Sequence, residues 1–342
     1  MLIVDLVPEV GSDLIDRMAR GHELTQILLT GVHYEVFDKT STQITAPELA
    51  QMLGTDEVLT EKFLVVLTAL RLLDKSDKHF CNTEVAELFL TQKSPFYQGN
   101  LIRLVAQGRK PGCVHIDMQK KEEQVGAVKE KPFESVYKRE FILAMAEAAM
   151  RGTLQKTVRE ISLFPEFAQA QKLLDLGGGH GLYGIAFAQL NSRLKVTVFD
   201  LPGVVDVARG NICTHGFESQ VETVAGDFNK DVLGADYDIV FASDIFYRPA
   251  EVIAPVLQKI HAALKPGGIV ILKHWFYNEE GTGPLETVLF DFKLSVRRNL
   301  NHHIYKQKEF ISLLEATGFK YAFKRDISIT AKPSLLLVGR KG

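Results

Sequence analysis

The 342-residue sequence has few cysteines, almost no excess charge and no long apolar run. Its three cysteines, Cys81, Cys113 and Cys213, are scattered singly, which excludes a disulfide framework and predicts reduced thiols in a cytoplasmic protein. No stretch approaches the ~20 apolar residues of a membrane span. The apolar but acidic N-terminus lacks the basic region of a signal peptide, so we expect none. A net charge of −2 gives no general sign of nucleic-acid binding.

The spacing of apolar residues predicts two domains joined by a polar connector. Residues 1–105 are expected to form a mainly helical, winged-helix-like domain. Residues 106–132 mix glycine, proline and both charges, which is typical of a connector. Residues 133–342 open on one long helix, expected over 133–161, and then alternate strands with helices. This alternation predicts a doubly wound, Rossmann-like α/β domain with a parallel core sheet.

A winged helix by itself suggests DNA binding, but the charge of the first domain argues against it. Residues 1–100 carry 15 acidic and 8 basic side chains, an excess of seven negative charges. A protein that reads DNA needs a basic face to neutralise phosphates. The helix that would enter the groove, within "LTEKFLVVLTALRLL" (59–73), exposes apolar residues instead. We therefore expect this domain to dimerise and not to bind nucleic acid.

A glycine-rich turn at 173–187, "LLDLGGGHGLYGIAF", marks the ligand site of the second domain. Gly179, Gly181 and Gly184 spell the G-x-G-x-x-G of dinucleotide-binding proteins, a weak signal alone. In a doubly wound sheet, ligands bind at the carboxyl ends of the strands, where this turn lies. A dinucleotide there would bring its pyrophosphate against the carboxylate of Asp175, which disfavours that ligand.

Acidic residues end three successive predicted strands, at Asp175, Asp200 and Asp227, and Phe228 follows the last. Glycines let the backbone approach the amino-acid part of a ligand, Asp200 can chelate two ribose hydroxyls, and Asp227 with Phe228 can frame an adenine. A ligand that is cationic at one end and carries a ribose and an adenine is S-adenosylmethionine. Each aspartate alone is also explained as a cap of the following helix, but three together favour this cofactor.

These segments resemble the small-molecule O-methyltransferases of the hydroxyindole and caffeic-acid type. The similarity includes "LLDLGGGHG", "VFDLPGVVDVA" and "VAGDF", an N-terminal dimerisation domain around "ITAPELAQMLGT", and the C-terminal "KEFISLLEATGF". The resemblance implies a homodimer in which the N-terminal helices of one subunit help to close the substrate pocket of the other. It also implies a pocket phenylalanine at Phe141 and a methionine near the cofactor at Met145.

Motif and resemblance together give two sets of expected site residues. The cofactor set is Asp175, Gly177, Gly179, Asp200, Leu201, Asp227, Phe228, Ser243 and Met145. The substrate set is Phe141, Arg248, Leu294, His302 and His303. No ligand spacing for a metal ion is present, and we expect no metal.

The catalytic segment departs from the family. Its members place a His-Asp pair after the fourth strand of the sheet, where the histidine takes the proton of a phenol; here Tyr247 and Arg248 stand at those positions. The glutamate that orients the histidine is replaced within His302, His303 and Ile304, and a lysine common after the fourth strand is replaced by Ser243.

Three replacements for the missing base are weighed: Tyr247, His274, and the loop pair His302 and His303, with Tyr247 and His274 taken as the catalytic candidates. Tyr247 could relay a proton or hydrogen-bond the acceptor, and an aromatic pocket wall is an equally good reading. His274 ends the fifth strand at the edge of the crevice, where a satisfied structural histidine is the competing reading. The neighbours His302 and His303 lie in a loop, and paired loop histidines are usually solvated.

The sequence thus predicts a cytoplasmic, homodimeric enzyme that methylates a hydroxyl of a small or medium aromatic metabolite with S-adenosylmethionine. Methylation of an activated ring carbon stays open, because "IFY" (245–247) is similar to a tetrapyrrole ring-carbon methyltransferase of the same structural family. A carbon acceptor loses its proton only after methyl transfer, when a weak base suffices. A cofactor-binding member without methyl transfer is the third alternative.

Overall fold

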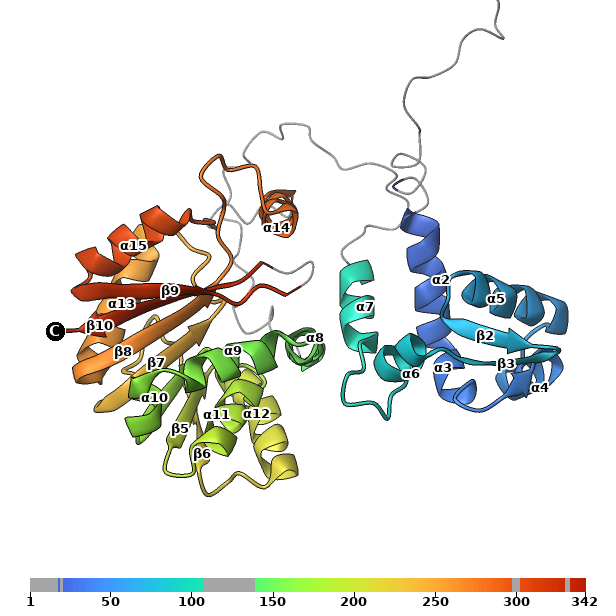
Figure 1. Cartoon of the computed structure of the whole chain (residues 1–342), viewed down its shortest axis with the longest axis horizontal. Coiled ribbons are helices and arrows are strands. Elements are labelled where there is room, and N and C mark those ends of the chain that lie inside the picture. The colour runs from blue at the N-terminus through green and yellow to red at the C-terminus, as the bar shows by residue number, and fades with distance from the viewer. Residues whose placement is uncertain (1–17, 19–20, 108–138, 297–301, 330–332) are drawn as a thin grey trace, which may run out of the picture. The chain divides into compact units, whose positions relative to one another are not determined.

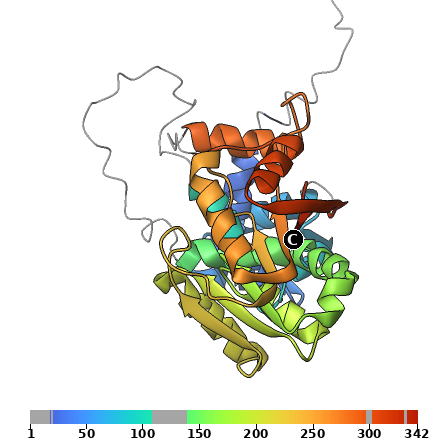
Figure 2. The ribbon, with the colours of Figure 1, turned by 90° about the vertical axis from the view of Figure 1, so that its left-hand side faces the viewer.

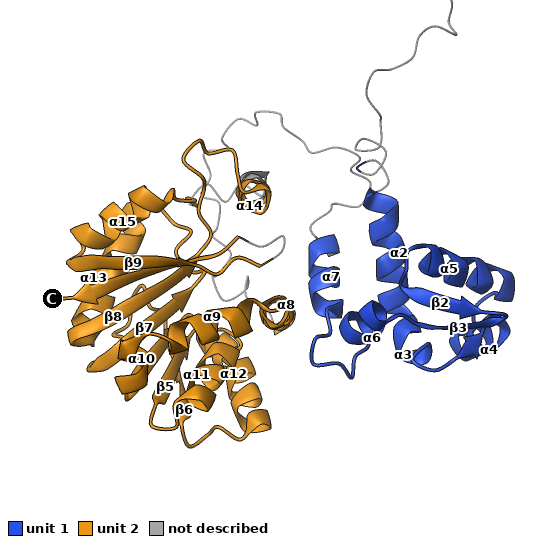
Figure 3. Cartoon of the chain, viewed as in Figure 1, with its two compact units in different colours: residues 1–110 blue, residues 111–342 orange. Residues whose placement is uncertain are grey.

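The computed structural model describes Met18 and residues 21–107, 139–296, 302–329 and 333–342. The chain forms two compact units, Met1–Lys110 and Pro111–Gly342 (Figure 3). Of the connector predicted over 106–132, residues 108–132 lie outside the described residues, as does Cys113. Among the residues described, no helix is long and apolar enough to cross a membrane.

Unit 1 is mainly helical and contains one small antiparallel sheet, in the strand order β1-β3-β2. Its elements are α2 (Gly21–His33), α3 (Val36–Lys39), β1 (Ile44–Thr45), α4 (Ala46–Leu53), α5 (Glu57–Ala69), β2 (Leu73–Ser76), β3 (His79–Asn82), α6 (Glu84–Leu90) and α7 (Gly99–Gln107). The capping box of Thr45 and Glu48 starts α4, and the side chain of Asp56 accepts a hydrogen bond from the Leu59 amide to start α5. Local sequence thus fixes where both helices begin.

Helix α5 is apolar on two faces. Leu64 and Leu67 are fully buried in the core of the unit. On the outer side, Val58 and Leu59 are 61% and 67% exposed, and Val65 is 45% exposed. A helix of a lone small domain normally presents polar side chains to water, so this outer face has the character of a surface that another protein covers.

Unit 2 is a seven-stranded sheet with helices on both faces (Figure 1). Its elements are α8 (Arg139–Met150), α9 (Thr153–Ser162), α10 (Pro165–Gln169), β4 (Lys172–Leu176), α11 (Leu182–Leu190), β5 (Lys195–Asp200), α12 (Pro202–His215), β6 (Val221–Ala225), β7 (Tyr237–Ser243), α13 (Ala250–Ala263), β8 (Leu264–His274), α14 (Leu285–Val296), α15 (Gln307–Ala316), β9 (Phe319–Asp326) and β10 (Leu335–Lys341).

The strand order of this sheet is β6-β5-β4-β7-β8-β10-β9. The first five strands in this order are parallel, and β10 runs antiparallel to both of its neighbours. The chain leaves β4 outward to β5 and β6 and then crosses to β7, so β4 and β7 flank the switch point where such sheets bind ligands. The predicted doubly wound α/β fold is confirmed.

Side chains of the central strands alternate between two apolar cores. Phe241 and Ile271 point to the face covered by α9 to α12, and Val240 and Leu272 point to the face covered by α13 and α15. Figure 2 turns the ribbon so that the C-terminal end of β10 faces the viewer. Because both faces are covered, the edge formed by the carboxyl ends of the parallel strands is the place left for a site.

The prediction of a single long helix over 133–161 is wrong. The described part of this segment forms α8 and α9, separated at Arg151 and Gly152. Gly152 has a φ of 111°, a value that residues with a Cβ atom rarely adopt, and it stands at the N-cap of α9. The glycine therefore ends one helix and redirects the chain into the next.

The turn after β4 needs glycine at adjacent positions for different reasons. Gly177 and Gly179 have φ values of 67° and 54°, in the left-handed region. A Cβ atom on Gly178 would lie 2.7 Å from Cγ1 of Val198 and 2.8 Å from Cγ of Asp175. The turn thus packs its backbone directly on the carboxylate that ends β4.

Substitution Gly178→Ala is therefore expected to destabilise the protein by about 1–3 kcal/mol, the usual cost of overpacking a tight site. The free energy of unfolding in urea, followed by circular dichroism, measures this loss. Gly210→Ala is the control, because a Cβ atom there, inside α12, meets nothing within 4 Å. The control should match the wild type or exceed it by up to about 1 kcal/mol. Equal stability of the two variants contradicts the tight packing of the turn.

Candidate active site

Asp175 lies near the carboxyl end of β4, and its pKa is strongly raised. Its side chain is 1% exposed, and Oδ2 has no hydrogen-bond partner. Burial, and after it the nearby carboxylate of Asp200, raise the pKa of Asp175 to about 7. A buried carboxylate with an unsatisfied oxygen is suited to a cationic ligand, which would favour its ionised form.

Asp200 ends the neighbouring strand β5 and holds the glycine turn. Its two carboxylate oxygens accept hydrogen bonds from the backbone amides of Gly179, at 2.8 Å, and Leu201, at 2.7 Å. The Gly177 amide donates to the backbone carbonyl of Phe199 at 2.8 Å. The structure therefore brings Asp175, Gly177, Gly179 and Asp200 together, as the sequence predicts for one ligand.

Asp227 follows β6, next to the end of β5, where the Gly226 amide donates to the carbonyl of Asp200 at 2.9 Å. Its carboxylate forms an ion pair with Lys230 at 3.0 Å and accepts from Asn229 at 2.9 Å. Burial opposes ionisation, but these contacts outweigh it and lower the pKa of Asp227. Asp227 is thus a fixed, ionised hydrogen-bond acceptor at the third strand end.

An ion pair between a buried lysine and a 32% exposed aspartate joins the ends of β7 and β8, and it was not predicted from the sequence. Lys273 is 4% exposed and binds the carboxylate of Asp244, to which the hydroxyl of Ser243 also donates. Burial opposes both charges, yet the attraction between them lowers the pKa of Asp244 and raises that of Lys273. The sequence did contain a signal for Asp244. It stands at the carboxyl end of β7, the fourth strand of this sheet along the chain, as Asp175, Asp200 and Asp227 stand at the ends of the first three.

Tyr247 is held by this ion pair. Its hydroxyl donates to Oδ1 of Asp244 at 2.9 Å and accepts from the amide of Trp275 at 3.3 Å. Burial, and next the charge of Asp244, raise the pKa of Tyr247 well above its ordinary value. A phenol in this state keeps its proton, so the geometry favours Tyr247 as a pocket wall over Tyr247 as a base.

His274 lies directly beside Tyr247, with ring centroids 4.0 Å apart. Nε2 is 3.1 Å from the carbonyl of Phe246 and donates to it, while Nδ1 is buried without a partner. Burial lowers the pKa of His274 to about 4. The side chain is a neutral imidazole at physiological pH, and its catalytic role stays a prediction.

A histidine–carboxylate pair lies near Tyr247 and His274. Asp291 on α14 accepts from Nε2 of His302 at 2.6 Å and from the hydroxyl of Tyr277 at 2.6 Å. The side chain of His302 is only 10% exposed, so the expectation of a solvated histidine is wrong for this residue. The cause is the carboxylate on α14, which sequence spacing alone does not place beside it.

The other expected substrate residues are less tightly held. His303 is 42% exposed and pairs with Glu309, in line with the solvated reading. Arg248 and Leu294 are half-buried, and the Arg248 carbonyl accepts from the hydroxyl of Tyr305 at 2.7 Å. Their contact with a substrate stays a prediction.

Helix α8 carries Phe141 and Met145, both half-buried. Phe141 packs on a small apolar cluster that includes Leu201 and Val204, at the start of α12. The helix therefore lies beside the end of β5, which is compatible with the expected proximity of Met145 to the cofactor.

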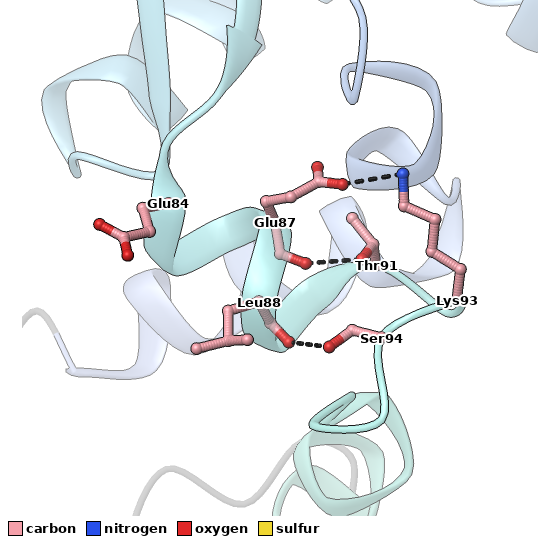
Figure 4. A pocket seen from close by; sticks show the side chains of 6 residues that line it. All are labelled: Glu84, Glu87, Leu88, Thr91, Lys93 and Ser94. Atoms are coloured by element: carbon pink, nitrogen blue, oxygen red, sulfur yellow. Dashed lines mark hydrogen bonds and ion pairs between the residues drawn. The ribbon is translucent and has the colours of Figure 1, made fainter.

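A depression in unit 1 has no reactive chemistry. It measures about 520 Å³ and is lined by Glu84, Glu87, Leu88, Thr91, Lys93 and Ser94 (Figure 4). Its polar groups satisfy one another: Glu87 pairs with Lys93 at 2.8 Å, and Thr91 and Ser94 donate to backbone carbonyls of α6. Within the described ranges, no group of three or more His, Cys, Asp or Glu side chains could hold a metal ion.

Comparison with known proteins identifies the family of the chain. Residues 117–320 match the model of the O-methyltransferase domain, and residues 17–92 match that of the O-methyltransferase dimerisation domain. The chain belongs to the O-methyltransferase family. The predicted family is thereby confirmed, and with it an S-adenosylmethionine-dependent O-methyltransferase with an N-terminal dimerisation domain.

Individual relatives of this O-methyltransferase cover most of its length. An uncharacterized protein of Methanocaldococcus jannaschii is 32% identical over 81% of this chain and 73% of its own. The 3-hydroxy-5-methyl-1-naphthoate 3-O-methyltransferase of Streptomyces sahachiroi is 26% identical over 83% of each chain. The crystal structure of human N-acetylserotonin methyltransferase in complex with S-adenosylmethionine shares the fold, with a TM-score of 0.77 and 23% identity over 98% of this chain and 99% of that one.

The raised pKa of Asp175 predicts how the stability of the ligand-free O-methyltransferase depends on pH. The folded protein holds this proton up to about pH 7, whereas the unfolded chain releases it near 3.8. Between these values the folded state binds more protons, so its stability falls as the pH rises. Asp175→Asn should remove this contribution, so the melting temperature of the variant should fall less between pH 5 and pH 8 than that of the wild type. Each kcal/mol of unfolding free energy removed from the pH dependence corresponds to about 2–4 °C in melting temperature.

Thermal unfolding at several pH values measures this slope. Asp206→Asn is the matched control, because Asp206 is an exposed aspartate of α12 that pairs with Arg209. An Asp175→Asn slope equal to those of the wild type and the control would mean that the carboxyl group of Asp175 is ionised throughout this range.

Proposed function

We propose that this O-methyltransferase methylates a hydroxyl of a small or medium aromatic metabolite. The observation that carries the proposal is the aromatic cluster at the carboxyl ends of β7 and β8. Phe290 on α14 packs edge-on against Tyr247 and Trp275, with centroid distances of 5.1 Å and 5.7 Å. Rings in this arrangement offer faces and edges to a planar acceptor. The naphthoate and acetylserotonin relatives are named for aromatic acceptors of this size.

The residues at the ends of β4, β5 and β6 fit the cofactor. Gly177 and Gly179 let the backbone approach its amino-acid part, and the carboxyl group of Asp175, with Oδ2 unsatisfied, lies against Gly178 between them. We assign the ribose to Asp200 with Leu201 and the adenine to Asp227 with Phe228. When bound, the cofactor supplies a methyl group on a positively charged sulfur. The task of the protein is to hold the acceptor oxygen in line about 3 Å away and to remove its proton.

We further propose a cytoplasmic homodimer formed through the winged-helix-like unit 1. Support comes from the outer face of α5, where Val58, Leu59 and Val65 are exposed. The acidic excess of this unit, 15 acidic against 8 basic side chains in residues 1–100, opposes DNA as the alternative occupant of this face.

The cofactor assignment predicts that Asp200→Ala weakens S-adenosylmethionine binding by about 1.5–3 kcal/mol, the scale of hydrogen bonds to a charged group. Titration calorimetry gives the dissociation constant, and Asp206→Ala serves as the exposed aspartate control. Unchanged affinity in Asp200→Ala contradicts the ribose assignment. Binding of NAD in place of S-adenosylmethionine contradicts the whole cofactor site.

Methyl transfer itself is tested with labelled S-adenosylmethionine and two acceptor probes, 3-hydroxy-5-methyl-1-naphthoate and N-acetylserotonin. We expect a product one methyl group heavier, with the new methyl on oxygen when its position is read by NMR. A methyl on a ring carbon would favour the alternative reaction. If the enzyme methylates neither of these probes nor any other hydroxylated aromatic compound offered to it, the proposed function is contradicted.

The dimer proposal predicts a mass of about twice the 38.2 kDa chain by light scattering at micromolar concentration. Leu59→Lys should raise the dissociation constant at least about 10-fold, which is 1.4 kcal/mol, because it places a charge in the apolar contact. Val232→Lys is the control, since Val232 is an 86% exposed residue of unit 2. A wild-type mass near that of one chain would remove the basis of this proposal.

A further inference from the structure

By the resemblance, Tyr247 stands at the position of the family's catalytic histidine, and the segment whose amide binds the Tyr247 carbonyl also carries a histidine paired with a carboxylate. We propose that His302 takes the proton of the acceptor hydroxyl, and that Asp291 and Tyr277 position its ring. The inference rests on the hydroxyl methylation proposed above. It assigns a catalytic role to a residue that sequence reasoning weighed as a replacement base, set aside as solvated and placed among the substrate contacts.

The hydrogen bonds fix which nitrogen of His302 is basic. An ionised carboxylate only accepts hydrogen bonds, so Nε2 of His302 carries its hydrogen toward Oδ1 of Asp291, 2.6 Å away. The lone pair of the neutral ring is then on Nδ1. A histidine oriented by a carboxylate in this way is the arrangement of a general base, because the carboxylate also stabilises the imidazolium that forms.

Tyr277 completes the unit from the end of β8. Its hydroxyl donates to Oδ2 of Asp291 at 2.6 Å. Burial, and after it the hydrogen bond to Asp291, raise the pKa of Tyr277, so it remains a donor. The carboxylate of Asp291 is thus bound at both oxygens, which limits the rotation of the group that holds His302.

The pair lies at the proposed acceptor site. Asp291 follows Phe290 on α14, and Phe290 packs against the rings of Tyr247 and Trp275. On the other side of the pair, the amide of His303 donates to the carbonyl of Tyr247 at 3.2 Å. Both segments that carry the pair therefore contact the aromatic cluster.

The competing groups in this cluster are less suited to accept a proton. The hydroxyl of Tyr247 donates a hydrogen bond to Asp244 and keeps its proton. His274 is 1% exposed, and its Nε2 partner is the carbonyl of Phe246, which stabilises an imidazolium less than a carboxylate does. His302 is buried enough to be oriented, while its 10% exposure leaves a route for the proton to water.

The step balances without a further reactant. The acceptor oxygen forms its bond to the methyl carbon as the carbon–sulfur bond breaks, and the electron pair of that bond goes to sulfur. The hydroxyl proton goes to Nδ1 of His302. The resulting imidazolium is paired with the Asp291 carboxylate until it loses the proton to solvent.

The test compares His302→Gln with the wild type on acceptors of different acidity. The probes are 2-naphthol, 4-nitrophenol and 3-hydroxy-5-methyl-1-naphthoate, at a pH where 4-nitrophenol is ionised and 2-naphthol is not. We expect kcat on the un-ionised acceptors to fall about 10²-fold, the scale of a lost general base. The loss should be much smaller on 4-nitrophenol, whose proton has already left, and S-adenosylmethionine affinity should be unchanged.

Two further variants separate proton chemistry from structure. Added imidazole should restore part of the kcat of His302→Ala, which a purely structural role would not allow. Asp291→Asn should lower kcat more than it changes KM, and Asp291→Glu should recover part of the loss. His215→Gln is the histidine control, since His215 is exposed at the end of α12 and bonds only a backbone carbonyl among the described contacts.

The outcomes distinguish this inference from the proposed function. Suppose the wild type methylates a hydroxyl, and His302→Gln lowers kcat equally on all acceptors or on none. The role of His302 is then overturned, and the proposed function stands. Failure of imidazole rescue in a folded His302→Ala that binds S-adenosylmethionine also counts against it. A wild type that binds S-adenosylmethionine and methylates none of the probes contradicts the proposed function, and this inference with it.

Discussion

The cofactor half of the molecule depends on one buried carboxylate. Asp175, the penultimate residue of β4, has one oxygen unsatisfied, and such a group costs free energy unless a partner arrives. The glycines above it are small for the same reason: a Cβ atom on Gly178 would lie 2.8 Å from its Cγ, and one on Gly184 would lie 3.5 Å from Oδ2. The turn is therefore shaped around the carboxylate as much as around a ligand. A cationic ligand would compensate this cost, and a pyrophosphate would not, which is why we place the sulfonium cofactor at this turn.

The ion pair of Lys273 and Asp244 organises the ends of β7 and β8, where we place the acceptor. The resemblance to the family places Ser243 where a lysine is common, and the structure has Lys273 directly opposite Ser243 on the neighbouring strand. An ammonium group is thus present at this end of the sheet, delivered from β8 in place of β7. Asp244 balances its charge and at the same time accepts the hydrogen bond of Tyr247. Tyr247, which the resemblance places at the position of the family's histidine, is consequently fixed as a hydrogen-bond donor.

The sequence was most informative where a feature is contiguous. Strands and helices of unit 2 follow from the alternation of apolar runs, and the cofactor turn follows from Asp175 with the adjacent glycines. Pairings between distant segments were not predictable. The bonds of Lys273 to Asp244 and of His302 to Asp291 depend on strand register and on the placement of α14, which no local pattern encodes. The helix break at Gly152 was missed because one glycine in a helical pattern is often tolerated.

The choice between oxygen and carbon as the methyl acceptor depends on when the proton must leave. A phenol, with a pKa near 10, is mostly un-ionised at neutral pH, so its proton has to leave before or during transfer. A ring carbon gives up its proton only afterwards, from a far more acidic intermediate, and needs little from the protein. A site offering only Tyr247 and His274 would suit carbon, because one keeps its proton and burial holds the other near a pKa of 4. A histidine oriented by a doubly anchored carboxylate is what an oxygen acceptor requires and a carbon acceptor does not. The pairing of His302 with Asp291 therefore favours oxygen.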